Sequence, residues 1–437
     1  MASETDVSEG SRVGRSSRKG LRSLIAEAEI DTRLVGMTAA LLIIWIGFDV
    51  VTGGLFITPR NLFNLSLQAA AVAVMATGMV LVLVTRNVDL SVGSLLGVLA
   101  MVMGAVQVYV LPDILGYGHP LIWVLTLLIG MLLGGLIGLV QGSVVAFGGV
   151  PSFIVTLGGL LIWRGAAWWV TEGQTIAPLD DNFNVIGGGV SGTIGPMWSW
   201  VIGVLAIVLV IAQLWNARRR RRKFGFPLRP LWAEGMIALL LAAATVAVVA
   251  TMNAYPLPER IAQQVLEARG VEVAQGQSVE LGHGLAVPVL ILAGVAIAIA
   301  LLARRTRFGR HVFAIGGNPD AAELAGVRTR RTVVLVFALM GVLCAVAAAI
   351  TSARLQAASN DLGTLDELRV IAAAVIGGTS LGGGIGSVIG AVLGAVVMQS
   401  LQSGMALVGI AASLQNIVIG LVLILAVYLD RLYQRRK

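Results

Sequence analysis

Charged residues are scarce in this chain of 437 residues, of which only 12% are Asp, Glu, Lys or Arg. An ordinary soluble domain carries about 25% charged residues. The sequence also has a single cysteine, Cys344, and three histidines, His119, His283 and His311. A lone cysteine excludes an intrachain disulfide, and the scattered histidines have no metal-ligand spacing. We therefore expect no disulfide, no metal site and no cofactor.

Lysine is rarer still and occurs only at positions 19, 223 and 437. A Walker A loop needs the pattern G-x-x-x-x-G-K-[ST], in which backbone N–H groups and the lysine hold phosphates. None of the lysines follows such a glycine. No Ser–His–Asp set and no paired carboxylates are expected to converge on one helix face, which disfavours a membrane-embedded enzyme. The sequence therefore predicts that the chain is not an enzyme.

Apolar residues make up 57% of the chain, and glycine contributes 54 residues. Stretches of ~20 apolar residues are the criterion for a transmembrane helix. They predict an all-α, polytopic transmembrane bundle of about 12 spans, at residues 34–56, 66–85, 93–111, 120–146, 152–171, 198–216, 232–253, 286–304, 332–353, 369–383, 387–407 and 413–430. The spans 152–171 and 369–383 have Gly- or Pro-rich ends, which are typical of broken or re-entrant helices.

The formal net charge of +8 comes from arginines that cluster between the apolar runs. This clustering indicates membrane orientation and not nucleic-acid binding, because cytoplasmic loops are enriched in Lys and Arg. The basic run at 218–223 is expected in a cytoplasmic loop and the segment 254–285 on the opposite side. An even span count then places a basic tail, 1–33, and a second tail, 431–437, in the cytoplasm around a membrane domain, 34–430. The first tail has no apolar core and is not a signal peptide.

Two short segments repeat one pattern: Val92–Gly97 reads VGSLLG, and Ile385–Gly390 reads IGSVIG. Each follows a span that runs in the same direction, so the match predicts a parallel internal repeat. Gly93 and Gly386 would each allow a tight entry to a helix. The alternative is chance, because Gly-Ser followed by aliphatic residues recurs in glycine-rich membrane chains.

A charged segment at about 305–331 separates two spans and is expected in water, since unpaired polar backbone is not tolerated in hydrocarbon. Asn318 and Pro319 predict a helix N-cap and first position, and Asp320 complements the positive helix end. Gly326 is placed to end that helix. We predict a short cytoplasmic helix that docks on another protein; a solvated connector is the alternative.

Polar residues near span ends suggest a translocation path. Asp89 is an ionisable residue at the edge of a span, which is a functional hypothesis by default. The alternative makes Asp89 the N-cap of a helix that begins at Ser91 or Val92. Arg164 and Arg354 are interpreted as anchors at the membrane interface. The complete set of candidates for the path is Asp89, Ser91, Gly93, Thr156, Asn360, Glu367 and Gly386.

Three blocks resemble one known family: TGMVLVLVTRNVDLSVGSLLG at 77–97, PSFIVTLGGLLIWRGAAWWVTEGQTI at 151–176, and RTRFGRHVFAIGGNPDAAELAGV at 305–327 continuing through IAAAVIGGTSLGGGIGS at 371–387. They are similar to the membrane permeases of bacterial ATP-binding-cassette (ABC) importers for ribose, xylose and galactose. The basic loop and span at 217–253 resemble the xylose-type members, so a pentose such as D-xylose is favoured. The chain departs from the family at Arg86-Asn87, where Gly-Gly is usual, and in the segment 257–284.

The resemblance implies a homodimer of permeases in the bacterial inner membrane, surrounded by lipid. It also implies a cytoplasmic ABC ATPase, a periplasmic sugar-binding protein and a small sugar as substrate. Glu323 to Gly326 resembles the family's motif for coupling to the ATPase. Two alternatives remain on the residues alone, an ion-coupled secondary transporter or channel and an ABC permease for another small polar solute.

Overall fold

The computed structural model describes residues 32–267 and 281–435, and in these residues it contains helices and isolated β-bridges but no strands. Among the described residues, ten helices are long and apolar enough to cross a membrane. They are α2 (Thr32–Val51), α3 (Pro59–Val84), α4 (Val92–Ala105, continued through a π-turn and α5 to Leu115), α6 (Ile122–Ala146), α7 (Ser152–Thr171), α9 (Gly195–Lys223), α10 (Leu231–Asn253), α12 (Val287–Arg305), α15 (Thr329–Leu355) and α17 (Val388–Leu407). The predicted all-α membrane bundle is confirmed.

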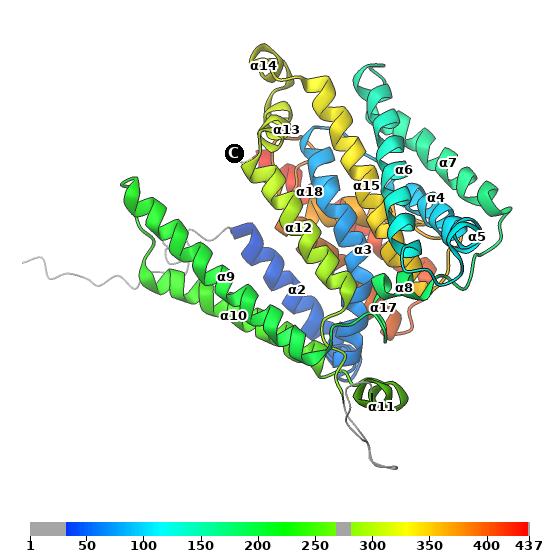
Figure 1. Ribbon diagram of the computed structural model, residues 1–437. Coiled ribbons are helices and arrows are strands. Elements are labelled where there is room, and N and C mark those ends of the chain that lie inside the picture. The colour runs from blue at the N-terminus through cyan, green and yellow to red at the C-terminus, as the bar shows by residue number, and fades with distance from the viewer. Residues whose placement is uncertain (1–31, 268–280, 436–437) are drawn as a thin grey trace, which may run out of the picture.

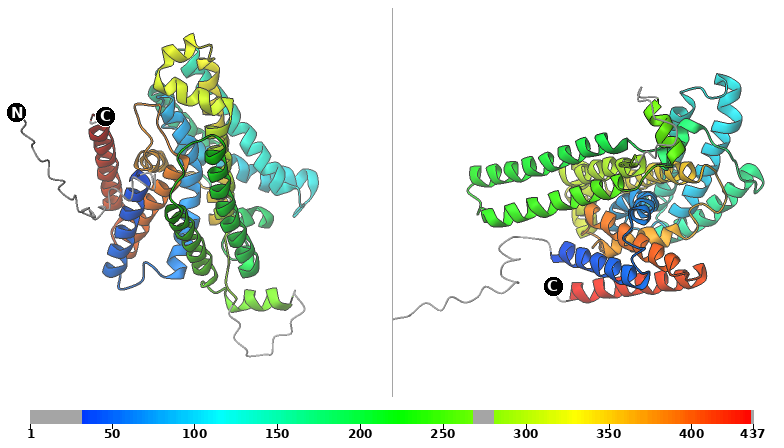
Figure 2. Two further views of the ribbon diagram at one scale, coloured as in Figure 1. Left: turned by 90° about the vertical axis from the view of Figure 1, so that its left-hand side faces the viewer. Right: turned by 90° about the horizontal axis from the view of Figure 1, so that it is seen from below.

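Helix α3 lies at the centre of the bundle and is seen end-on in the right-hand view of Figure 2. Its apolar window is 94% buried, although it has the composition of a lipid-facing helix. Helices α6 and α15 pack closely because glycines remove the side chains between them. A Cβ at Gly134 would collide with the carbonyl of Gly341, and one at Gly138 with the carbonyl of Phe337. Such small-residue contacts are what membrane helices use in place of bulky cores.

Different helices mark the two ends of the bundle (Figure 1). At one end lie α13 (Arg307–Gly317) and α14 (Pro319–Leu324), and at the other lies α11 (Glu259–Glu267). Arg220 of α9 lines the same cavity as Arg304 and Arg305, which directly precede α13. We call this the basic end and the opposite one the α11 end. The predicted placement of 218–223 and 305–331 on one side, with 254–285 on the other, agrees with the positions of the described residues of these segments.

Helices α9 and α10 form a hairpin that stands off one side of the bundle (Figures 1 and 2). The prediction of a loop at 218–223 was wrong, because α9 continues through this run and ends at Lys223. The hairpin is held at the α11 end by an apolar cluster in which Val249 and Met252 pack with Phe63 and Leu67 of α3. β-Bridges also join Thr193 to Ala286 there.

The predicted span 369–383 was wrong as a continuous helix. Helix α16 runs only from Asp366 to Ile376, a length of about 16 Å, whereas a bilayer core is about 30 Å thick. Ala358 pairs with Ile176 beyond the far end of α7, and Gly384 N donates to Val84 O at the basic end. The chain from 356 to 384 therefore crosses the bundle as an irregular half followed by a helical half.

The remaining predicted spans differ from the structure mainly at their ends. Helix α3 begins at Pro59, several residues before the predicted start, and α7 is an unbroken helix. Helix α18 (Ala412–Arg435) is apolar over Ala412–Tyr428. The basic tail at 1–31 and residues 268–280 and 436–437 lie outside the described residues.

Candidate functional site

Two segments interrupt the helices inside the bundle. We call residues 85–91, between α3 and α4, the first break, and residues 356–365, between α15 and α16, the second break. Each follows a long, largely buried helix and contains a non-glycine residue of positive φ, Arg86 (φ 61°) in the first break and Gln356 (φ 52°) in the second. Such conformations are uncommon for non-glycine residues and cluster at functional or strained sites.

The first break is paired within the protein. The Asp89 side chain is 1% exposed, and its carboxylate accepts hydrogen bonds from Ser91 N at 2.9 Å and Ser91 Oγ at 2.6 Å. Thr156 Oγ1 donates to Val88 O at 3.3 Å, and Val88 N donates to Ser152 Oγ at 3.2 Å. Ser91 itself occupies the N-cap position of α4, so Asp89 closes a turn ahead of the helix and does not cap it.

The second break is held by an arginine from α7. Arg164 Nη1 donates to Asn360 O at 2.7 Å and to Leu362 O at 3.1 Å. The interpretation of Arg164 as an interface anchor was wrong, because its guanidinium points into the protein and binds two carbonyls of this segment. Arg164 is the thirteenth residue of α7, roughly 18 Å from its start. The carbonyls of Asn360 and Leu362 in the second break therefore lie at mid-membrane depth.

The second break meets the start of α4, just after the first break, at Gly93. A Cβ at this position would collide with the Gly363 carbonyl and the Glu367 carboxylate, and one at Gly97 would press on Leu362 O. The missing side chains allow α4 and the second break to approach backbone to backbone. Gly93 is thus required by packing between segments that are far apart in sequence.

Polar groups of the second break are exposed or unpaired. Asp361 and Thr364 are exposed. Among the described residues, Asn360 Oδ1 and Glu367 Oε2 are buried and have no hydrogen-bond partner. Sequence reasoning missed the neighbouring pair, in which Arg369 Nη1 lies 2.9 Å from Asp366 Oδ1. The spacing of three residues between these opposite charges on a helix was a usable signal.

The candidates for the path divide between the breaks. Asp89, Ser91 and Thr156 belong to the first break and its neighbours, Asn360 and Glu367 to the second, with Gly93 between them.

Gly386 lies in the loop before α17, where its Cβ would meet the side chains of Val84 and Val80. The repeated motifs begin helices that both run away from the basic end. They are not placed alike, because Gly93 is inside α4 whereas Gly386 precedes α17.

The short helix α14 has the predicted caps. Asn318 Oδ1 accepts from Ala321 N at 3.0 Å, and Pro319 occupies the first position. At its other end Gly326 has φ 82°, with Gly326 N bonded to Glu323 O and Val327 N bonded to Ala322 O. This pair of bonds is a Schellman motif, which favours glycine. The tip exposes Leu324, at 91%.

Arg86 links this helix to the first break. Its Nε donates to Gly316 O at 2.9 Å and its Nη2 donates to Gly317 O at 2.8 Å, at the junction of α13 and α14. A charged donor to two carbonyls is a strong contact. The hydrogen bonds of Arg86 therefore connect the end of α3 directly to the exposed helix.

A membrane bundle with an interrupted, polar crossing at mid-depth and a capped helix at its basic end has the organisation of a transport permease. The chain belongs to the family described as branched-chain amino acid transport system / permease component, whose model matches residues 61–231 and 227–427. The two matches support an internal repeat.

The relatives to which the chain is similar are also named as permeases. The chain is 36% identical over 417 residues to the xylose transport system permease protein XylH of Escherichia coli (strain K12), covering 95% of each chain. It is 37% identical to XylH of Haemophilus influenzae, covering 92% of this chain and 96% of the relative. The ribose import permease protein RbsC of E. coli (strain K12) is 29% identical, covering 86% and 87%. No solved structure matches the chain.

Proposed function

We propose that this chain is the membrane permease subunit of an ABC importer for a monosaccharide, with a pentose such as D-xylose favoured. The observation that carries the proposal is the similarity to XylH over 95% of both chains. Because so little of the chain is unmatched, the match must include most of the α9–α10 hairpin. The ribose permease relative is less similar and covers less of the chain.

The second break supports a path for a polar solute. Irregular backbone at membrane depth is tolerated only where it is buried in protein or lines a water-filled cavity. Asp361 and Thr364 are exposed there, whereas Asn360 Oδ1 and Glu367 Oε2 are buried without hydrogen-bond partners among the described residues and would have to be uncovered to bind a solute's hydroxyl groups. In this proposal the sugar passes along the second break, and Asp89, Ser91, Gly93, Thr156 and Gly386 shape the wall behind it.

A second copy of the chain would complete the path. Leu365 is 37% exposed and Leu368 36% exposed beside the polar groups of the second break, so this surface is mixed in character and poorly suited to lipid. A homodimer that faces the second break of one copy toward that of the other would enclose the polar groups in a shared, water-filled space.

Helix α14 is the proposed contact with a cytoplasmic ABC ATPase. Its rigid caps, exposed Leu324 and exposed Glu323 suit a short element that fits into another protein. The proposed coupling residues are Asn318, Pro319, Asp320, Glu323 and Gly326. Proline at 326 is incompatible with φ 82° and should distort the helix end.

The coupling proposal is tested with Gly326→Pro and Glu323→Arg in the assembled transporter. We expect both variants to reach the membrane and to lose sugar-stimulated ATP hydrolysis and uptake. Arg222→Gln, at the same end of the bundle but on α9, is the control and should retain both. Normal stimulated hydrolysis in a well-expressed Gly326→Pro variant would contradict the role of α14.

The proposed orientation places the basic end and both termini in the cytoplasm of a bacterial inner membrane, following the excess of arginine at that end. Single cysteines at Arg222 and Glu259, in a Cys344→Ser background, are labelled with an impermeant reagent on whole cells. We expect labelling at 259 alone. Labelling at 222 alone would invert the orientation.

Transport itself is tested in proteoliposomes that contain the chain, its ATPase and its sugar-binding protein. We expect uptake of labelled D-xylose that requires ATP and the binding protein. Uptake that follows an ion gradient without ATP would instead identify a secondary transporter, and ATP-driven uptake of a different solute would retain the class and change the substrate.

A further inference from the structure

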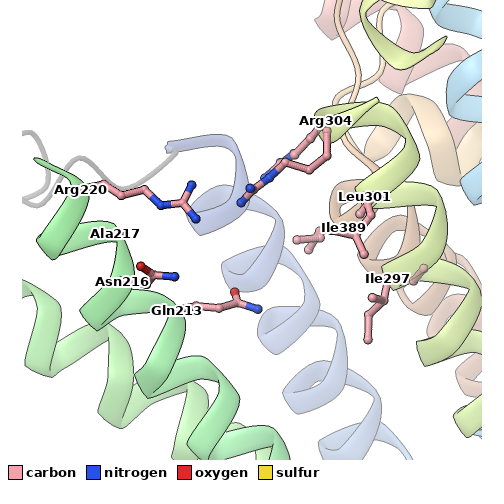
Figure 3. A pocket seen from close by; sticks show the side chains of 11 residues that line it. Gln213, Asn216, Ala217, Arg220, Ile297, Leu301, Arg304 and Ile389 are labelled. Carbon is pink, nitrogen blue, oxygen red and sulfur yellow. The ribbon is translucent and has the colours of Figure 1, made fainter. Parts of the chain in front are cut away.

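A cavity of about 710 Å³ opens at the basic end between the α9–α10 hairpin and the bundle. Its walls come from α9 on one side and from α12, with Ile389 of α17, on the other (Figure 3). It is remote from the second break. Nothing in the proposed transport cycle uses it.

The attachment of the hairpin explains why the cavity exists. At the α11 end the hairpin is joined to α3 and α12 by the apolar cluster around Phe63 and Met252 and by the β-bridge between Thr193 and Ala286. At the basic end α9 faces α12 across the cavity. The two helices therefore enclose a space that opens toward one membrane surface.

The lining changes from charged to apolar along the depth of the cavity. At the mouth lie the guanidinium groups of Arg220 and Arg304, and further in lie the apolar side chains of Ile297 and Leu301 (Figure 3). Arg305, which follows Arg304 at the end of α12, also lines the cavity. No acidic side chain of the described residues lines it. Within the described parts of the chain these three arginine side chains have no hydrogen bond or ion pair.

We propose that this cavity binds an anionic phospholipid, with the phosphate at the three arginines and the acyl chains along Ile297 and Leu301. The arginines end α9 and α12, where a membrane-spanning helix reaches the headgroup level. Basic pockets between membrane helices on this side are suited to acidic headgroups. Gln213 and Asn216 lie just inside the mouth and offer hydrogen bonds to the glycerol and ester oxygens. The bound lipid fills the space that direct helix packing leaves open, so it supports the hairpin against the bundle.

The test uses the full chain purified in detergent and titrated with dioleoyl phosphatidylglycerol or dioleoyl phosphatidylcholine, with bound lipid counted by native mass spectrometry. We expect the unaltered chain to prefer phosphatidylglycerol by at least about tenfold, since each Arg near an anionic surface contributes about 1 kcal/mol. The triple variant Arg220→Gln, Arg304→Gln, Arg305→Gln should lose that preference.

Matched variants distinguish binding at the cavity from a general effect of positive charge at the basic end. Arg222→Gln, Arg330→Gln and Arg331→Gln together remove the same charge at the same end without touching the lining, and should keep the preference. Arg220→Gln alone changes an exposed residue remote from the apolar cluster, and should weaken phosphatidylglycerol binding about fivefold even if the triple variant is unstable. An unchanged preference in Arg220→Gln, or equal losses in the two triple variants, overturns the proposal.

A final comparison separates lipid from free phosphate. Glycerol phosphate at the concentration of the lipid should not displace phosphatidylglycerol, because it lacks the acyl chains. Ile297→Ser with Leu301→Ser should weaken phosphatidylglycerol binding. Displacement by equimolar glycerol phosphate, with no effect of these two substitutions, would show a headgroup-only phosphate site and contradict the lipid proposal.

Discussion

The first and second breaks each connect two helices, but they differ in how their polar groups are hydrogen-bonded. In the first break Asp89 is buried and bonded to Ser91, and Val88 is bonded at both its N–H and its carbonyl. In the second break Arg164 satisfies two carbonyls, while Asn360 Oδ1 and Glu367 Oε2 have no partner among the described residues. A buried polar group without a partner is costly. We therefore propose that the first break is a fixed structural turn and that the solute contacts the second break.

The hydrogen bonds of Arg86 connect the first break to the junction of α13 and α14. Arg86 bonds the carbonyls of Gly316 and Gly317, so we propose that a displacement of α14 is transmitted through Arg86 to the end of α3 and to the turn at Asp89. In this proposal the displacement then passes from α4 to the second break across the Gly93–Gly363 contact. The proposal gives the two breaks distinct roles, transmission for the first and contact with the sugar for the second.

The largest effect is expected where the second break meets α4. Gly93→Leu should prevent stable folding, because the new side chain collides with the Gly363 backbone and overpacking costs about 1–3 kcal/mol or more. Gly386→Leu should impair transport with a smaller loss of melting temperature, since its neighbours are side chains that can shift. Gly158→Leu on α7 has open space and is the control. A Gly93→Leu variant that melts and transports as the parent does would show that the close Gly93–Gly363 contact is not required for folding or transport.

The next effect separates function from stability. Glu367→Gln keeps the shape of a side chain whose Oε2 has no partner among the described residues, so the melting temperature should stay unchanged. Sugar uptake should fall about tenfold or more, as expected for the loss of a charged hydrogen-bond partner. Uptake is measured in proteoliposomes beside a melting curve of the same preparation. Parental uptake would place the sugar elsewhere, and a large drop in melting temperature would make Glu367 structural.

At Asp89, in contrast to Glu367, we expect a loss of stability. Asp89→Ala removes the acceptor of two buried hydrogen bonds from Ser91 and should lower the stability of the chain by about 1–3 kcal/mol. Asp89→Asn retains a carbonyl acceptor and should recover most of that loss. Thermal melting of the purified variants measures both. If Asp89→Ala were as stable as the parent but inactive, the first break would belong to the path itself.

The smallest effect is expected at Thr156. Thr156→Val keeps the volume and removes the hydroxyl that bonds Val88 O and Ser152 O, with an expected loss of about 1 kcal/mol. Melting and uptake are recorded together, and uptake should stay near the parental rate. A loss of uptake larger than the loss of folded protein would show that the first break also contacts the sugar.

Several features followed from the sequence because their causes are local. Apolar length placed most of the spans, and the alternation of basic and acidic segments placed the two ends. The caps of α14 depend on Asn318, Pro319 and Gly326, which are neighbours in the chain. For the same reason the arginine run at 218–223 was placed at the correct end, although its helical state was missed.

The candidate site could be predicted only in part. Asp89, Asn360 and Glu367 were recognisable as polar residues at the edges of apolar runs. Nothing in their surroundings indicated that Asp89 is paired and Glu367 Oε2 is not, because their environments depend on residues far along the chain. Arg164 illustrates this best, since a snorkelling anchor and a buried donor have the same local sequence.

The amino-acid sequence by itself determined that this protein is a helical membrane permease with a capped helix at its basic end, because hydrophobic length, charge bias and capping act over a few residues. Only the tertiary structure decided that one crossing is broken and where its backbone is held. Arg164 reaches Asn360 across 196 residues and Arg86 reaches Gly316 across 230. Contacts between such distant segments depend on how the helices pack, and helix packing is set by the whole bundle at once.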